Sequence, residues 1–144
     1  MSTEDLLKIY KVVVRSAVEY CSVVYHSLIP QYLADRLELL QKQTMRIIYG
    51  NNLDYGAMIE SNKLETLASR REAACLKFAQ KASDTARLGS RWFPLNTNER
   101  DVRGTTRRKY IEKNYRTERD MNNPIKYMVR LLNKEHMSNL AVLE

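Results

Sequence analysis

Apolar residues in the first thirty positions recur at steps of three and four, which is the period of one helix face. A cap at Ser2 or Thr3 is followed by two acidic residues, as is typical of a helix N-terminus. We therefore expect a helix over residues 3–27, which Pro30 ends. Its predicted inner face consists of Leu6, Ile9, Tyr10, Val13, Ala17, Cys21 and Val24.

Three further helices are predicted by the same period. The second covers residues 31–49, with Gly50 at the usual C-terminal position. Asp54 caps a short third helix that runs through Glu60, and Thr66 caps a fourth that Gly89 ends. The inner faces are expected to be Leu33, Leu37, Leu40, Thr44, Ile47 and Ile48 in the second helix, and Leu67, Arg71, Ala74, Cys75, Phe78 and Ala82 in the fourth.

The pattern changes after residue 90. Residues 92–95, Trp-Phe-Pro-Leu, form a compact apolar plug, which we expect to dock on the helices rather than to contact a ligand. Asn123-Pro124 places a cap and a first-turn proline before a short helix that ends near Leu132. The predicted fold is all-α: a bundle of about four helices over residues 1–88, and a basic, partly irregular C-terminal extension over residues 89–144 that ends in a short helix.

Composition agrees with a helical protein of one small domain and an extension. Four glycines and three prolines among 144 residues favour long helices with few tight turns. Cys21 and Cys75 are too few for a disulfide framework or a cysteine-rich zinc site. No apolar run reaches the ~18 residues of a membrane span, and the acidic start does not resemble a signal peptide. We expect an intracellular protein with no membrane partner.

The formal charge of +7 is unevenly distributed along the chain. Residues 1–69 carry seven basic and eight acidic groups, whereas residues 70–144 carry seventeen basic and nine acidic groups. The densest stretch is residues 100–130, with ten basic groups against four acidic ones. A basic segment of this kind attracts phosphate backbones or anionic surfaces, although a merely solvated basic surface has the same composition.

Signatures of catalysis are missing from the sequence. The four glycines are scattered at positions 50, 56, 89 and 104, so they form no phosphate-binding loop. His26 and His136 are isolated, and no pair of carboxylates has a setting that suggests metal-assisted chemistry. We predict no catalytic residue, no metal site, no cofactor and no small-molecule substrate.

Basic and aromatic residues alternate in the extension, and a basic pair lies on the second predicted helix. Such residues neutralise phosphates and stack on bases. The candidate nucleic-acid-binding residues are Lys42, Arg46, Arg103, Arg107, Arg108, Lys109, Tyr110, Lys113 and Tyr115. The alternative is that Tyr110 and Tyr115 pack their rings on the bundle while the basic side chains extend into solvent.

Four segments in order resemble the C-terminal region of non-LTR (LINE-type) retrotransposon reverse transcriptases, particularly those of Jockey-like elements. They are RSAVEYCSVVYH at 15–26, LELLQKQTMRII at 37–48, LETL at 64–67 with RRE at 70–72 and CLKFA at 75–79, and RTER at 116–119 with NPI at 123–125 and RLLN at 130–133. Tyr25 stands where that family commonly has Trp, and Val23 where it often has Pro. Both changes keep an apolar core role and affect no catalytic group.

The resemblance implies a helical thumb with a C-terminal extension, which in that family follows the polymerase palm and grips the primer–template duplex. It implies an RNA/DNA hybrid or DNA as partner through the phosphate backbone, the palm domain as partner in a full-length parent, and a nuclear location. The aspartate motif of the RNA-directed DNA polymerase and the endonuclease lie upstream in the family, so we expect a non-catalytic fragment. The alternatives are a helical protein–protein interaction module and a decayed element remnant without selected function.

Overall fold

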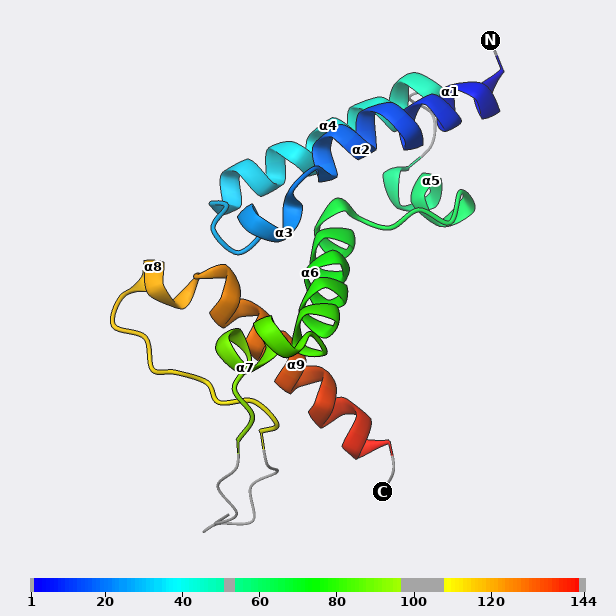
Figure 1. Cartoon of the computed structure of the whole chain (residues 1–144). Helices are drawn as coiled ribbons and strands as arrows, with labels where there is room; N and C mark the ends of the chain where they lie inside the picture. Colours follow the sequence, from blue (N-terminus) through cyan, green and yellow to red (C-terminus); the bar gives the residue numbers. More distant parts are fainter. Residues whose placement is uncertain (1, 51–53, 97–107, 143–144) are drawn as a thin grey trace. The chain divides into compact units, whose positions relative to one another are not determined.

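The computed structural model describes residues 2–50, 54–96 and 108–142 and confirms an all-α fold (Figure 1). Extended pairing in the described residues is limited to one isolated antiparallel bridge, between Leu95 and Tyr110. The chain divides into two compact units, residues 1–73 (unit 1) and residues 74–144 (unit 2). The boundary falls inside a helix, and earlier than the 88/89 boundary expected from the sequence.

Unit 1 begins with a segmented helical rod. Its elements are α1 (Thr3–Ile9), the π-helical turn η1 (Tyr10–Val14), α2 (Arg15–Glu19) and α3 (Ser22–Tyr25). Ser2 and Asp5 form a reciprocal capping box at the start, which satisfies two backbone donors at the helix N-terminus. The rod lies beside α4 (Gln31–Tyr49), and α5 (Tyr55–Ser61) also contacts α4 (Figure 1).

The single helix expected over residues 3–27 is interrupted, and its predicted inner face is partly wrong. The left-handed backbone of Cys21, with φ of 53°, breaks the rod between α2 and α3. Within the rod, the wider π turn shifts the inward positions to Tyr10, Val14, Val18 and Ser22, at steps of four. Residues predicted to face inward but found exposed are Ile9, Val13, Ala17, Cys21 and Val24.

The core of unit 1 consists of Tyr10, Met45, Met58 and Leu64, all buried and in mutual contact. The bounds predicted for α4 are confirmed, and the Asp54 side chain caps α5 by accepting from the Gly56 N–H at 3.0 Å. The predicted inner face of α4 is rotated, because Gln41 and Met45 are its buried residues whereas Ile47 is 79% exposed.

The fourth predicted helix is two helices, α6 (Leu67–Ser83) and α7 (Ala86–Trp92). Gly89 was expected to end the fourth helix, but it is buried within α7. A Cβ added at Gly89 would lie 2.3 Å from the Ser83 carbonyl oxygen, so glycine permits α7 to pack closely on the end of α6. Along α6, Leu67, Arg71, Cys75 and Ala82 are buried as predicted, whereas Phe78 is exposed.

Unit 2 ends in α8 (Glu118–Met121) and α9 (Pro124–Ala141). The start of α9 is as predicted, with the Asn123 side chain accepting from the Ile125 N–H at 3.0 Å and proline in the first turn. The predicted length of α9 is wrong, because the expected short helix continues beyond Leu132 to Ala141. The basic extension is therefore anchored on a long helix that buries Met128, Val129, Leu131 and Leu132.

Candidate nucleic-acid interface

The net positive charge of the chain belongs entirely to unit 2. Unit 1 contains nine basic and nine acidic residues, whereas unit 2 contains fifteen basic and eight acidic residues and carries the whole net charge of +7. A phosphate backbone is consequently attracted to unit 2, with a strength that falls as salt is added.

Unit 2 presents much of this charge on the basic segment, which we define as residues 108–119. It contains five basic and two acidic residues. Lys109, Lys113 and Arg119 are exposed, and no carboxylate of the described residues forms an ion pair with them. Arg108 is exposed but donates to Glu112 at 2.7 Å. The basic segment therefore offers unneutralised cations to a ligand.

The basic segment is fastened to α9 by two further basic residues. Lys126 donates to the Asn114 carbonyl at 3.3 Å and to Asp120 at 2.6 Å. The hydrogen bond from Lys126 to Asp120 is the main reason that the pKa of Asp120 is lowered. Arg130 donates to the Met121 carbonyl at 3.0 Å, and its guanidinium lies 5.9 Å from the centre of the Tyr115 ring. These contacts hold an otherwise irregular segment on a long helix.

Tyr110 does not offer a stacking surface. Its side chain is 7% exposed, and its ring meets Phe93 edge to face with centroids 6.3 Å apart. Both backbone polar groups of Tyr110 bond to the buried Asn133 side chain, at 2.9 Å for the N–H and 3.1 Å for the carbonyl. The prediction of Tyr110 as a base-stacking residue is wrong for this reason: the ring is part of the packing of unit 2. Tyr115 is 45% exposed, so its face is partly open.

The remaining candidates belong to unit 1 or lie outside the described residues. Lys42 and Arg46 lie one turn apart on α4, in unit 1. Arg46 is exposed, whereas Lys42 is half-buried with its ammonium 5.8 Å from the centre of the Tyr55 ring. Arg103 and Arg107 lie outside the described residues.

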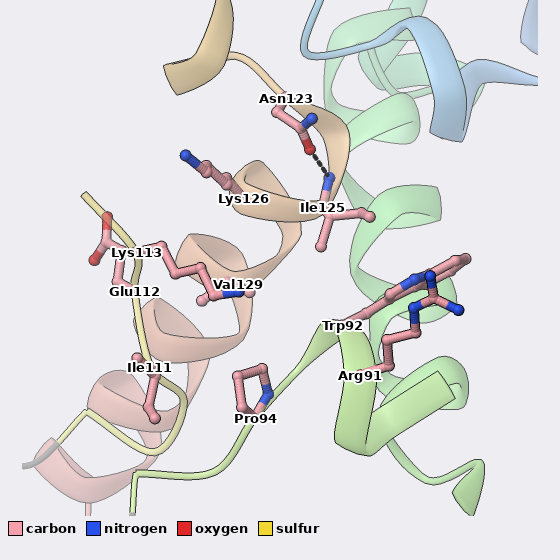
Figure 2. A pocket seen from close by; sticks show the side chains of 10 residues that line it. All are labelled: Arg91, Trp92, Pro94, Ile111, Glu112, Lys113, Asn123, Ile125, Lys126 and Val129. Atoms are coloured by element: carbon pink, nitrogen blue, oxygen red, sulfur yellow. Dashed lines mark hydrogen bonds between the residues drawn. The ribbon is translucent and has the colours of Figure 1, made fainter. Parts of the chain in front are cut away.

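A pocket that the sequence did not indicate opens beside the basic segment (Figure 2). Its volume is about 200 Å³, and we call it the Trp92 pocket. Its apolar walls are supplied by Trp92, Pro94, Ile111, Ile125 and Val129, and its polar lining includes Arg91, Glu112, Lys113 and Lys126. These side chains come from α7 and Pro94 just after it, from the basic segment and from α9, so only the fold brings them together (Figure 2).

Polar side chains help to hold unit 1 together. Gln41 is 1% exposed; its Oε1 accepts from the Tyr10 hydroxyl at 2.6 Å, and its Nε2 donates to the Tyr55 hydroxyl at 3.1 Å and the Glu65 carbonyl at 3.2 Å. Burial raises the pKa of Tyr10 to about 12. A phenol in this setting donates a structural hydrogen bond at neutral pH.

Two carboxylates join distant segments of unit 1. Glu38 of α4 accepts from the N–H groups of Leu67 at 3.3 Å and Ala68 at 2.6 Å, and so caps the start of α6. Glu19 of α2 forms a two-pronged ion pair with Arg70, whose Nη2 lies 3.0 Å from Oε2. Both carboxylates have a structural partner.

Among the residues that the structure describes, no three His, Cys, Asp or Glu side chains are gathered as a metal ion requires. Within the same residues, every helix is too short or too polar to cross a membrane. Scans against protein-family models, curated proteins and solved structures find no match to the chain.

Proposed function

We propose that the chain is a non-catalytic nucleic-acid-binding module that grips a phosphate backbone through the basic segment of unit 2. The observation that carries this proposal is the row of exposed cations without carboxylate partners, Lys109, Lys113 and Arg119, on a segment anchored to α9. Contacts of this kind bind a backbone without reading its sequence. An RNA/DNA hybrid, the duplex implied by the resemblance to a reverse transcriptase thumb, is the proposed ligand.

Three of the segments that resemble a reverse transcriptase thumb lie together in unit 1. They contact one another through Glu19 and Arg70, through Glu38 and the start of α6, and through Gln41 and Glu65. Residues of these segments therefore join separate parts of unit 1.

The test is fluorescence anisotropy of a labelled RNA/DNA hybrid with the whole chain between 50 and 300 mM salt. If about five phosphates are neutralised, log K falls against log salt with a slope near −4. A flat salt response, or no binding at low salt, would overturn the proposal.

One double variant tests whether unit 1 contributes to phosphate binding. If Lys42 and Arg46 both contact phosphates, the double variant Lys42→Gln/Arg46→Gln reduces the magnitude of the slope by about 1.8. An unchanged slope restricts the interface to unit 2.

A second candidate function is protein–protein interaction through unit 1, and one observation favours it. Large apolar side chains are exposed along the rod and α4, among them Val12 at 71%, Tyr20 at 77% and Ile47 at 79%. Extensive exposed apolar surface marks interaction sites on soluble proteins. Size-exclusion chromatography with light scattering separates the two candidates: a monomer that binds hybrid supports nucleic-acid binding, and an oligomer insensitive to salt supports the interaction module.

A further inference from the structure

The Trp92 pocket is unlike the rest of the candidate interface because its walls are apolar. Figure 2 shows Trp92 and Arg91 on one side, the basic segment with Ile111 and Lys113 on another, and Ile125 and Val129 of α9 between them. A phosphate-binding surface has no need of an indole, a proline and three branched aliphatic side chains around a hollow. The pocket therefore suggests a ligand with an apolar, flat part.

The volume limits what the pocket holds. At about 200 Å³ it exceeds the ~150 Å³ cavity that accommodates a benzene ring in an engineered protein. It is smaller than the ~300–1,000 Å³ of typical cofactor and drug sites. One aromatic ring system fits this range, whereas a dinucleotide cofactor does not.

The charges around the pocket indicate what flanks that ring. Glu112 forms an ion pair with Arg108 at 2.7 Å, and Lys126 forms an ion pair with Asp120 at 2.6 Å. Arg91 and Lys113 are exposed, and no carboxylate of the described residues pairs with either. The groups left open to a ligand are cations, so the flat ligand should carry negative charge beside its ring.

We propose that the Trp92 pocket receives one unpaired nucleobase from a single-stranded stretch, with the phosphates on either side bound by Arg91 and Lys113. The base stacks against Trp92 and contacts Ile125 and Val129. This inference rests on the proposed function and deepens it, because the basic segment that grips the backbone also supplies one wall and one cation of the pocket. The molecule would then bind a strand where it leaves a duplex.

The chain contains one tryptophan, and it lies in this pocket, so intrinsic fluorescence reports on the site directly. The whole chain is titrated with a 12-nucleotide single strand, with the same backbone lacking all bases, and with a blunt hybrid of the same length. Binding of each is followed in parallel by anisotropy. We expect the single strand to quench Trp92, and the abasic backbone and the blunt hybrid to bind without quenching it.

Two variants measure the contribution of the ring. Trp92→Leu should weaken binding of the single strand by roughly 5- to 150-fold, which is the stacking energy of one base expressed as a ratio, and leave the abasic strand unaffected. The matched control is Phe78→Leu, which removes an exposed aromatic ring of the same unit that does not line the pocket. It should bind all three ligands as the unaltered chain does.

The outcomes separate this inference from the function on which it rests. Binding without quenching by the single strand, or equal quenching by the abasic backbone, overturns the base pocket and leaves backbone binding intact. Quenching by an acidic peptide with one tyrosine, at concentrations where the single strand has no effect, reassigns the pocket to a protein side chain. No anisotropy change with any nucleic acid overturns both proposals.

Discussion

The two units are nearly equal in length and differ in their surfaces. Unit 1 has no net charge, and ten large apolar side chains are exposed among its described residues. Unit 2 has a net charge of +7 and exposes six such side chains in its described part. An overall charge of +7 therefore describes neither unit: one surface is suited to apolar contact and the other to phosphate.

The units also differ in how buried polar groups are used. In unit 1 a buried glutamine side chain joins α4 to two tyrosines and a loop carbonyl. In unit 2 a buried asparagine side chain of α9 pairs with both backbone groups of Tyr110, next to the basic segment. The first device fixes a helical scaffold, and the second fixes the edge of the candidate interface. Each can be removed separately, with a matched control in its own helix.

The largest expected effect on stability is that of Asn133→Leu. This change leaves the N–H and the carbonyl of Tyr110 unpaired, and each unsatisfied buried group costs ~1–3 kcal/mol, so unit 2 should lose about 2–6 kcal/mol. Urea unfolding followed by Trp92 fluorescence measures this, because that residue lies in unit 2. Asn139→Leu, at an exposed position of α9, is the control. Equal losses in the two variants would contradict the role of Asn133.

Gln41→Met is the corresponding change in unit 1. Methionine fills similar space but makes none of the three hydrogen bonds, and it leaves the Tyr10 hydroxyl without its partner. We expect unit 1 to lose about 1–3 kcal/mol, measured by hydrogen exchange of the α4 amides. The exposed Gln43→Met on the same helix should change exchange little. If the α4 amides exchange at the same rates in both variants, the hydrogen bonds of Gln41 do not stabilise unit 1.

Gly89→Ala tests the close approach of α7 to the end of α6. Helix propensity alone would favour alanine by about 1 kcal/mol, but the new Cβ meets a backbone carbonyl that cannot rotate away. Overpacking of this kind costs ~1–3 kcal/mol, so a net loss of about 1 kcal/mol is expected by thermal unfolding. Gly56→Ala in unit 1 meets only the Asp54 side chain, at 3.0 Å, and should be close to neutral. A stabilised Gly89→Ala protein would disprove the contact.

The smallest expected effect is a dependence of stability on pH through His26 of unit 1. Burial, and then the neighbouring Arg71, lower the pKa of His26, while Glu72 opposes them. The unfolded chain therefore binds the proton more readily, and stability should fall as pH drops below the unfolded value of about 6.5. Melting temperatures at pH 7.5 and 5.5 should differ less in His26→Gln than in the unaltered chain, with His136→Gln as control. An equal difference in all three would exclude His26.

Local signals in the sequence predicted helix starts better than helix faces. The caps at Asp54 and Asn123 and the bounds of α4 were predicted because they depend on a few neighbouring residues. The face of the rod was mispredicted because Val12, Val13 and Val14 are all apolar, and only the π turn decides which of them points inward. Gly89 was read as a helix end because its close contact with Ser83 is tertiary.

The candidate site was likewise predictable only where it depends on local sequence. Charge density identified the basic segment, since composition alone reveals it. The sequence left the packing of Tyr110 as one of two alternatives and did not predict the Trp92 pocket, because both depend on residues 91–94, 108–113 and 123–133 meeting in space. The apolar plug at Trp92 was the one signal available, and it was interpreted as packing alone.

Two double variants test the claim that phosphate binding belongs to the basic segment of unit 2. The unit 2 variant is Lys113→Glu/Arg119→Glu, and the unit 1 variant is Lys8→Glu/Arg36→Glu. Both change exposed residues, and both lower the net charge by the same amount. In anisotropy titrations with the RNA/DNA hybrid, the unit 2 variant should lose about 1.8 in the magnitude of the salt slope, whereas the unit 1 variant keeps the slope of the unaltered chain. Equal changes in the two variants would contradict the claim, because attraction would then depend on total charge and not on the basic segment.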